Sequence, residues 1–220
     1  GMRAPIATPE TQRFFRAREG VSAGPGEPYG FAFESCRAAL MAYRERRTTV
    51  LEILRAIALA ELEIEGTASD TSRLAVSEGF DADQSSRLDL TLFPDYLVLM
   101  NTGDMEPIEQ ATFIDILAAG LPIKVLLQTD DLLGGSPDGV AGLGVPARQL
   151  ATMALGLTDV YVLQASASHL VQFREQIMRG ITWIGPALFS VFSGASGASS
   201  DLPPYLVAAA AMESRAFPAF

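Results

Sequence analysis

A chain of 220 residues is long enough to form one α/β domain with a substantial core. Hydrophobic residues make up 49% of the chain and charged residues 19%, which excludes a disordered chain, and no apolar run reaches the roughly 18 residues that a membrane span needs. The formal charge of −10 argues against nucleic acid, because binding to phosphates is built on clustered Lys and Arg. We therefore expect a soluble, cytoplasmic protein that binds neither nucleic acid nor membrane.

The cysteine and histidine content limits the metal chemistry of the chain. Cys36 is the only cysteine and His169 the only histidine. One thiol forms no internal disulfide, and it does not hold an iron–sulfur cluster, which usually takes four thiolates. With a single cysteine and a single histidine, structural zinc is equally implausible. We expect no iron–sulfur cluster in this chain and interpret Cys36 as a small packing residue.

The first half of the chain divides into an arm, a helical stretch and a polar stretch. Residues 1–30 are rich in Gly and Pro, which predicts an irregular arm. Residues 33–63 contain neither, and their apolar side chains recur at helical spacing, so we predict one long helix or two joined near Thr48. The polar stretch 66–89 predicts an exposed loop with at most one helical turn. We expect residues 31–220 to form a single domain that is part of a longer protein.

From residue 95 onward, predicted strands alternate with predicted helices. Apolar runs without alternation are typical of strands buried on both faces of a parallel sheet, and Gly and Pro mark the ends of the helices. The strands are predicted at 95–101, 123–128, 159–165 and 187–193, and the helices at 107–119, 147–156, 168–179 and 203–215. Crossover helices between successive strands predict an α/β fold, with a mostly parallel sheet and helices on both faces, in three layers.

Two of these strands end in polar turns, where parallel sheets place their ligand sites. The turns contain Asn101, Thr102, Gly103 and Asp104 after the first strand, and Thr129, Asp130 and Asp131 after the second. Small and acidic oxygen-bearing residues of this kind can hold a cation and a phosphate. The Gly-rich stretch 134–146 fits neither the dinucleotide fingerprint nor the P-loop, so a mobile loop is favoured there over a phosphate cradle.

Taken in order, these segments resemble the thiamine-diphosphate-binding domain of pyruvate:ferredoxin oxidoreductases and related 2-oxoacid oxidoreductases, over roughly residues 28–218. In that family a Gly-Asp-Gly turn follows a strand, a helix ends in Ala-Ser-Gly, a strand ends in Leu-Asp-Thr-Glu-Val, and a later segment reads Tyr-Asp-Gly-Pro-Ser-Leu-Ile. The corresponding segments here are Asn101-Thr102-Gly103-Asp104, Ala118-Ala119-Gly120, Leu127-Gln128-Thr129-Asp130-Asp131 and Trp183-Ile184-Gly185-Pro186-Ala187-Leu188-Phe189.

The resemblance implies a thiamine-diphosphate-binding-like fold and the oxidative decarboxylation of a 2-oxoacid such as pyruvate, with thiamine diphosphate and Mg²⁺ as cofactors. It implies cofactor binding by Thr102, Gly103, Asp104 and Thr129, and metal binding by Asp104, Thr129 and Asp131. The implied partners are other domains or subunits of a larger oxidoreductase, and a homo-oligomer is expected.

The chain also departs from the family pattern. By spacing, the position of the metal-binding aspartate falls on Thr102, with Asp104 two residues later, and Leu132-Leu133 replace an Asn-Thr pair. The family's cysteine-bearing loop has no counterpart before residue 28. We therefore expect the isolated chain to be inactive, and we keep a second hypothesis, a non-catalytic structural or regulatory domain that retained the fold but lost the cofactor site.

Two further alternatives concern residues outside the two turns. A flavodoxin-like binder of another nucleotide would use backbone contacts from the glycines of 134–144. His169 would act as a proton shuttle if it faced the mouth of the site, although a polar residue at a helix start is the simpler interpretation. No catalytic residue is assigned from the sequence.

Overall fold

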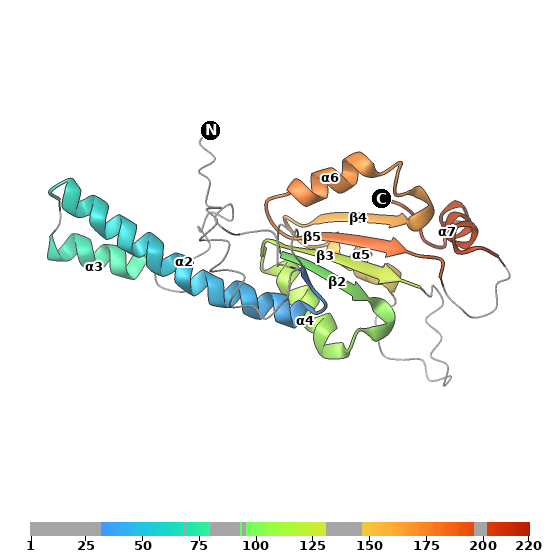
Figure 1. Ribbon diagram of the computed structural model, residues 1–220, viewed down its shortest axis with the longest axis horizontal. Coiled ribbons are helices and arrows are strands. Elements are labelled where there is room, and N and C mark those ends of the chain that lie inside the picture. The colour runs from blue at the N-terminus through green and yellow to red at the C-terminus, as the bar shows by residue number, and fades with distance from the viewer. Residues whose placement is uncertain (1–31, 68, 80–92, 94–95, 131–146, 196–201) are drawn as a thin grey trace, which may run out of the picture.

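The computed structural model describes residues 32–67, 69–79, 93, 96–130, 147–195 and 202–220. Its elements alternate between strands and helices from β2 onward (Figure 1). In chain order they are β1 (Ala32–Phe33), α2 (Cys36–Ile64), α3 (Asp70–Gly79), β2 (Tyr96–Asn101), η3 (Thr102–Asp104), α4 (Pro107–Ala118), β3 (Ile123–Thr129), α5 (Ala147–Ala154), β4 (Tyr161–Ser166), η4 (Ala167–His169), α6 (Arg174–Thr182), β5 (Ala187–Phe192) and α7 (Pro204–Glu213).

The described strands form one five-stranded sheet in the order β1-β2-β3-β5-β4, and every neighbouring pair is parallel. Because the strands are parallel, their carboxyl ends meet at one edge of the sheet, where α/β folds place their ligands. Helices cover both faces, so the predicted three-layer α/β fold is confirmed. The strand β1 was not predicted as a separate element; it pairs only through Ala32 and Phe33.

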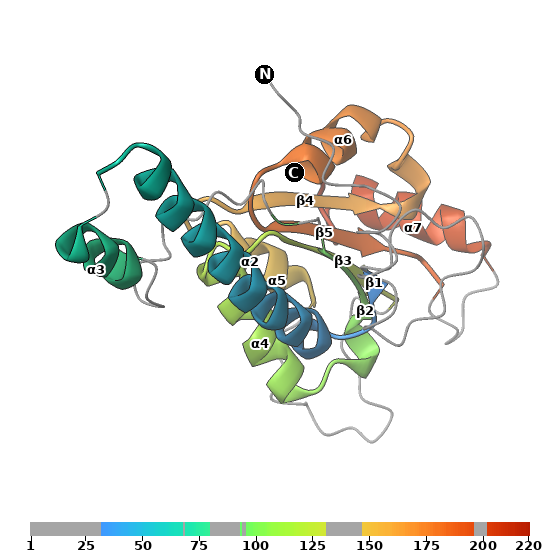
Figure 2. The same ribbon diagram turned by 60° about the vertical axis from the view of Figure 1, so that its left-hand side comes forward.

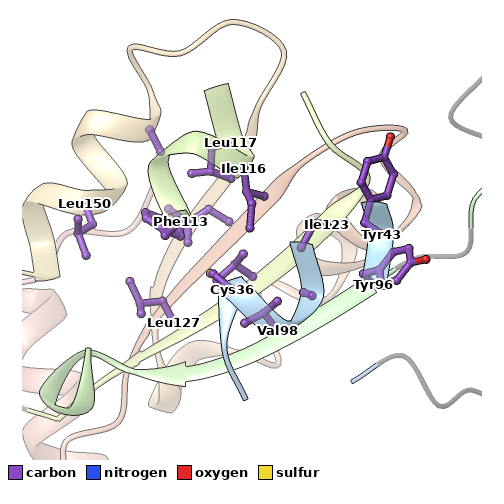
Figure 3. Packing of buried hydrophobic residues seen from close by; sticks show 14 of the residues in the cluster. Cys36, Tyr43, Tyr96, Val98, Phe113, Ile116, Leu117, Ile123, Leu127 and Leu150 are labelled. Atoms are coloured by element: carbon purple, nitrogen blue, oxygen red, sulfur yellow. The ribbon is translucent and has the colours of Figure 1, made fainter. Parts of the chain in front are cut away.

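One face of the sheet carries the larger core, which α2, α4 and α5 cover (Figure 2). Side chains from these helices and from β2 and β3 point toward one another in Figure 3. The opposite face carries a smaller cluster, in which Leu163, Ala187 and Phe189 pack against Ile177 of α6. The face that a residue occupies follows from the alternation of side chains along each strand: Leu188 belongs to the first core and Phe189 to the second.

The long helix predicted over 33–63 is one helix, α2, of 29 residues. Its buried residues are Cys36, Ala39 and Tyr43, all within its first third. The rest of the helix extends away from the sheet together with α3, as both Figure 1 and Figure 2 show. The expectation of a loop with at most one helical turn is wrong for 70–79, where α3 forms. This helix packs on α2, and a tertiary contact of that kind overrides the weak local preference of its polar residues.

The later helices follow the Pro and Gly signals closely, with one exception. Pro107 occupies the first turn of α4, and Gly120, with φ +67°, follows its end in the left-handed conformation that glycine adopts without strain. The helix predicted at 168–179 begins later than predicted. The carbonyl of His169 accepts backbone hydrogen bonds from Gln172 (2.9 Å) and Phe173 (3.3 Å), which close a turn before α6 starts.

The outer edge of β4 is paired with the C-terminal residues. Gln164 and Phe220 exchange two backbone hydrogen bonds, of 3.0 and 3.1 Å, and the Gln164 side chain donates to the carbonyl of Pro218 at 2.8 Å. Phe217 is fully buried and its ring packs 5.7 Å from that of Phe192, measured between ring centroids. These contacts hold the segment after α7 against the sheet.

Candidate functional site

The carboxyl ends of β2, β3 and β5 converge on Asp130, which directly follows β3. The Asn101 side chain donates to Asp130 Oδ2 at 2.5 Å, and the Gln128 side chain donates to Oδ1 at 2.9 Å. Ser193, which follows β5, donates its hydroxyl to Oδ1 as well. Three neighbouring strands therefore orient a single carboxylate at the edge where the ligand site was expected.

These hydrogen bonds set the charge of Asp130. Burial raises the pKa of its carboxyl group, but hydrogen bonds from Ser193, Gln128 and Asn101 favour the ionised form, and together they lower the pKa below its ordinary value. Asp130 is therefore an anion at neutral pH. A carboxylate offers about four acceptor positions, so these three bonds leave one position for a further donor or a cation.

The predicted turn Thr102–Asp104 lies at this edge and forms the short helix η3. Asn101 Oδ1 accepts a hydrogen bond from the Gly103 amide at 2.9 Å, so Asn101 connects the turn to Asp130. Thr102 is half-buried, whereas Asp104 is exposed. The structure thus places all three residues beside the site, but the carboxylate that the neighbouring strands hold is that of Asp130.

Thr129 is separated from this network by the geometry of the strand. Successive side chains of a strand point to opposite faces, and Thr129 is fully buried, in register with Phe192 of β5. Its hydroxyl has no hydrogen-bond partner among the described residues. The predicted ligand Asp131 and the stretch 134–146 lie outside the described residues. Within the described ranges, no three His, Cys, Asp or Glu side chains gather closely enough to hold a metal ion.

The N-terminus of α2, at the same edge, is occupied by a carboxylate from α4. Glu109 Oε2 accepts the amide of Cys36 at 2.9 Å and that of Arg37 at 3.4 Å, and Ser35 accepts the amide of Ala38 at 3.1 Å. The first amides of a helix are a common phosphate site, so Glu109 and Ser35 fill that site here. The interpretation of Cys36 as a packing residue is confirmed by its full burial.

His169 belongs to a separate polar group at the end of β4. Its Nδ1 lies 2.8 Å from the Ser168 hydroxyl and 3.2 Å from that of Ser166, and the two hydroxyls lie 2.8 Å apart. Because β4 is two strands from β3 and neighbouring strands lie roughly 4.8 Å apart, about 10 Å separates this group from Asp130. The structure does not bring His169 into the Asp130 network.

An apolar surface adjoins the Asp130 network on the face of the sheet that α6 partly covers. Leu97 and Leu99 of β2 are 37% and 44% exposed, and they share this face with Asn101. Gln128 of β3 is also exposed on this face. A ligand with a charged end and an apolar end would find both kinds of contact here.

The sequence interpretation placed Asp130 in the second polar turn but did not assign it as a ligand, and it did not identify Gln128 or Ser193. The alternation of side chains was a usable signal for two of them, because Gln128 and Asp130 are two residues apart and point to the same side. Ser193 had no such signal. Its role depends on β5 being the neighbour of β3, and the chain order does not reveal that pairing.

Comparison with known proteins adds no assignment: no protein-family model matches the chain, and no curated protein matches its sequence. Among the helices that the structure describes, none combines the length and apolar character that crossing a membrane requires.

Proposed function

We propose that this chain is the thiamine-diphosphate-binding domain of a 2-oxoacid:acceptor oxidoreductase of the pyruvate:ferredoxin type. The observation that carries the proposal is the ionised Asp130 carboxylate, which Asn101 and Ser193 hold between the ends of neighbouring parallel strands. The two turns that carry the family resemblance, Thr102–Asp104 and the end of β3, lie beside it.

The residues at this edge fit a metal-bound diphosphate. Mg²⁺ prefers oxygen ligands and is usually held by one or two carboxylates together with phosphates and water, and Asp130 has one acceptor position left for it. Asp104 is exposed at the neighbouring turn and is the second candidate carboxylate. The exposed Leu97 and Leu99 offer an apolar surface for the rings of the cofactor.

The cofactor, when bound, supplies the carbon nucleophile that attacks the 2-oxoacid. The role of this chain is then to bind and orient it: Asp130 anchors the metal end, and Asn101 and Ser193 fix the position of that carboxylate. The electron acceptor and its iron–sulfur clusters belong to other domains or subunits in this proposal, since the chain has a single cysteine.

A second candidate function is a non-catalytic domain that kept the fold. Two observations favour it: three donors already engage Asp130, and Glu109 occupies the α2 amides that would otherwise bind phosphate. In that case the Asp130 network joins β2, β3 and β5 and has no ligand.

Calorimetric titration of the whole chain with thiamine diphosphate, with and without Mg²⁺, distinguishes the two functions. The cofactor-binding domain predicts saturable, Mg²⁺-dependent binding that Asp130→Asn weakens by about tenfold or more. Asp159→Asn is the matched control, because Asp159 precedes β4 at the opposite edge of the sheet and is exposed. Asp104→Asn tests the second carboxylate. If the folded chain shows no binding, the non-catalytic domain is favoured.

A further inference from the structure

The last described segment, residues 202–220, attaches to the sheet through a small core of its own. Among the described residues, this cluster joins three residues of the segment to one residue of the sheet, and the four are Ala208, Ala211, Phe217 and Phe192. None of the four belongs to the larger core or to the cluster under α6. Two backbone hydrogen bonds between Phe220 and Gln164 hold the end of the segment. We call residues 202–220 the C-terminal unit.

Polar residues line the sheet where the C-terminal unit meets it. Along β5, Leu188 belongs to the larger core and Phe192 to the cluster of the C-terminal unit, and Ser190 lies between them on the same face. Gln164 of β4 is the register partner of Ser190, and Thr129 of β3 is the register partner of Phe192. The three polar residues are at most 1% exposed. We call Thr129, Gln164 and Ser190 the polar seam.

Each residue of the polar seam has a buried oxygen that no described residue bonds. These atoms are Thr129 Oγ1, Ser190 Oγ and Gln164 Oε1. The amide nitrogen of Gln164 is engaged, since it donates to the carbonyl of Pro218 in the C-terminal unit at 2.8 Å. Buried oxygens of this kind are nearly always bonded in folded proteins, because an unpaired one has lost its hydrogen bonds to water without replacement. The contact between the C-terminal unit and the sheet therefore carries an unfavourable term.

We propose that the C-terminal unit opens from the sheet as one piece, and that it separates along the polar seam. Opening breaks the contacts of a small apolar cluster and the hydrogen bonds that Gln164 makes to Pro218 and Phe220. In exchange, water bonds the oxygens of the polar seam. Opening of the C-terminal unit therefore costs less free energy than unfolding of the sheet, whose larger core stays intact.

The open state uncovers the polar group at the end of β4. In the closed state α7 packs on β4 and η4, at the carboxyl end of the sheet (Figure 1), and Met212 Sδ lies 3.9 Å from the hydroxyl of Ser166. The C-terminal unit is thus a lid over Ser166 and its partner His169. This inference is independent of the proposed function, because the Asp130 network lies on the other side of the sheet from the polar seam.

Native-state hydrogen exchange of the whole chain, followed by NMR, tests whether the C-terminal unit opens as one piece. We expect the amides of 208–211 in α7 and the paired amides of Gln164 and Phe220 to exchange through one shared opening. That exchange should be about tenfold or more faster than exchange in β3, which opens only with the whole sheet. Equal protection of α7 and β3, or unrelated exchange rates for α7 and Phe220, overturns the proposal.

The Thr129→Val substitution tests the role of the polar seam. Valine keeps the shape of threonine and removes the unpaired hydroxyl, so only the open state loses a hydrogen bond. We expect exchange of the α7 amides to slow by about fivefold, and Ser190→Ala should act in the same direction. The control is Thr182→Val, the same change at an exposed residue of α6 on the opposite face. Unchanged or faster α7 exchange in both seam variants overturns the proposal.

Discussion

At the scale of single residues, Asp130 joins three strand ends through one carboxylate. Hydrogen bonds to a charged group contribute about 1.5–3 kcal/mol each when buried. Asp130 is only half-buried, so solvent screening reduces this value, and we expect Asp130→Asn to lower the free energy of unfolding by about 1–2 kcal/mol at pH 7. Urea denaturation measures the difference, with Asp159→Asn as the control, for which little change is expected.

The stability that the Asp130 carboxylate contributes depends on pH with a defined sign. The pKa of Asp130 is lower in the folded protein than its ordinary value of 3.8. The carboxylate therefore contributes stability above that value, and the contribution is lost as pH falls through the lowered folded pKa. The difference between wild type and Asp130→Asn should shrink below pH 3.8. A difference that stays constant down to full acid unfolding would contradict this interpretation.

Cys36 shows the opposite pH dependence. Burial, and secondarily the Glu109 carboxylate, raise the pKa of its thiol from 9.0 to about 12. The unfolded chain releases this proton first, so the stability contribution is complete below pH 9.0 and is lost as pH rises toward 12. We expect wild type to lose stability relative to Cys36→Ala across this window in urea denaturation. A parallel pH dependence of the two proteins would contradict the raised pKa.

The carboxylate that the strand ends hold lies one residue away from two of the predicted ligands, Thr129 and Asp131. The resemblance placed a ligand at Thr129, and the structure places the held carboxylate at Asp130, on the other side of the strand. A spacing argument counts residues along the chain, but the face to which a residue points depends on where the strand begins relative to its neighbours. The sequence therefore predicts polar residues at the strand edge where Asp130 is held, but not which side chain the neighbouring strands hold.

At the scale of elements, the ends of helices were predictable where Pro or Gly determines the backbone. Pro107 and Gly120 bound α4 within one residue of the prediction. The start of α6 was not predictable in this way, because the hydroxyls of Ser166 and Ser168 and the His169 ring bond to one another, and no side chain caps η4. The helix α3 was missed because its contact with α2 is tertiary.

Among the glycines that the structure describes, Gly194 has the surroundings least tolerant of a side chain. It follows β5 with φ +73°, and a Cβ atom there would lie 2.1 Å from the carbonyl oxygen of Pro204 and 2.9 Å from the amide of Ala208. Both neighbours are backbone atoms of α7 and do not move alone. We expect Gly194→Ala to shift α7 and to cost more than about 3 kcal/mol, beyond the roughly 1–2 kcal/mol of left-handed strain.

The control for this substitution is Gly66→Ala. Gly66 has nearly the same φ, +68°, but a Cβ atom there would have no heavy atom within 4 Å beyond its own chain neighbours. Thermal denaturation should show a much larger loss for Gly194→Ala than for Gly66→Ala. Equal losses would mean that left-handed strain alone, and not the contact with Pro204, causes the loss of stability on substitution at residue 194.

At the scale of the whole molecule, the sequence predicted a parallel sheet but not the order of its strands. Crossover helices require parallel neighbours, and the apolar runs predict burial of both faces, although Leu97 and Leu99 leave one face of β2 exposed. The placement of β5 between β3 and β4 is a long-range choice that periodicity does not encode. Ser193 reaches Asp130 only through this order, so that part of the candidate site was beyond prediction.

The uneven burial of α2 predicts uneven stability along one helix. Its first third contributes three buried residues to the core, whereas the rest contributes none. We expect amides in 51–64 to exchange with deuterium much faster than those in 40–47, because local opening there exposes little apolar surface. Hydrogen exchange followed by mass spectrometry measures this. Uniform protection along α2 would contradict the expectation.

The pairing of Phe220 with Gln164 has a practical consequence for handling the protein. An uncovered edge strand is a template on which strands of other molecules add, and such addition is a common route to insoluble aggregates. The residues that end at Phe220 cover part of this edge, so they block the addition of a further strand there. A fusion partner or affinity tag attached directly after Phe220 would strain this pairing with Gln164, so a long flexible linker after Phe220 is the safer choice for expression.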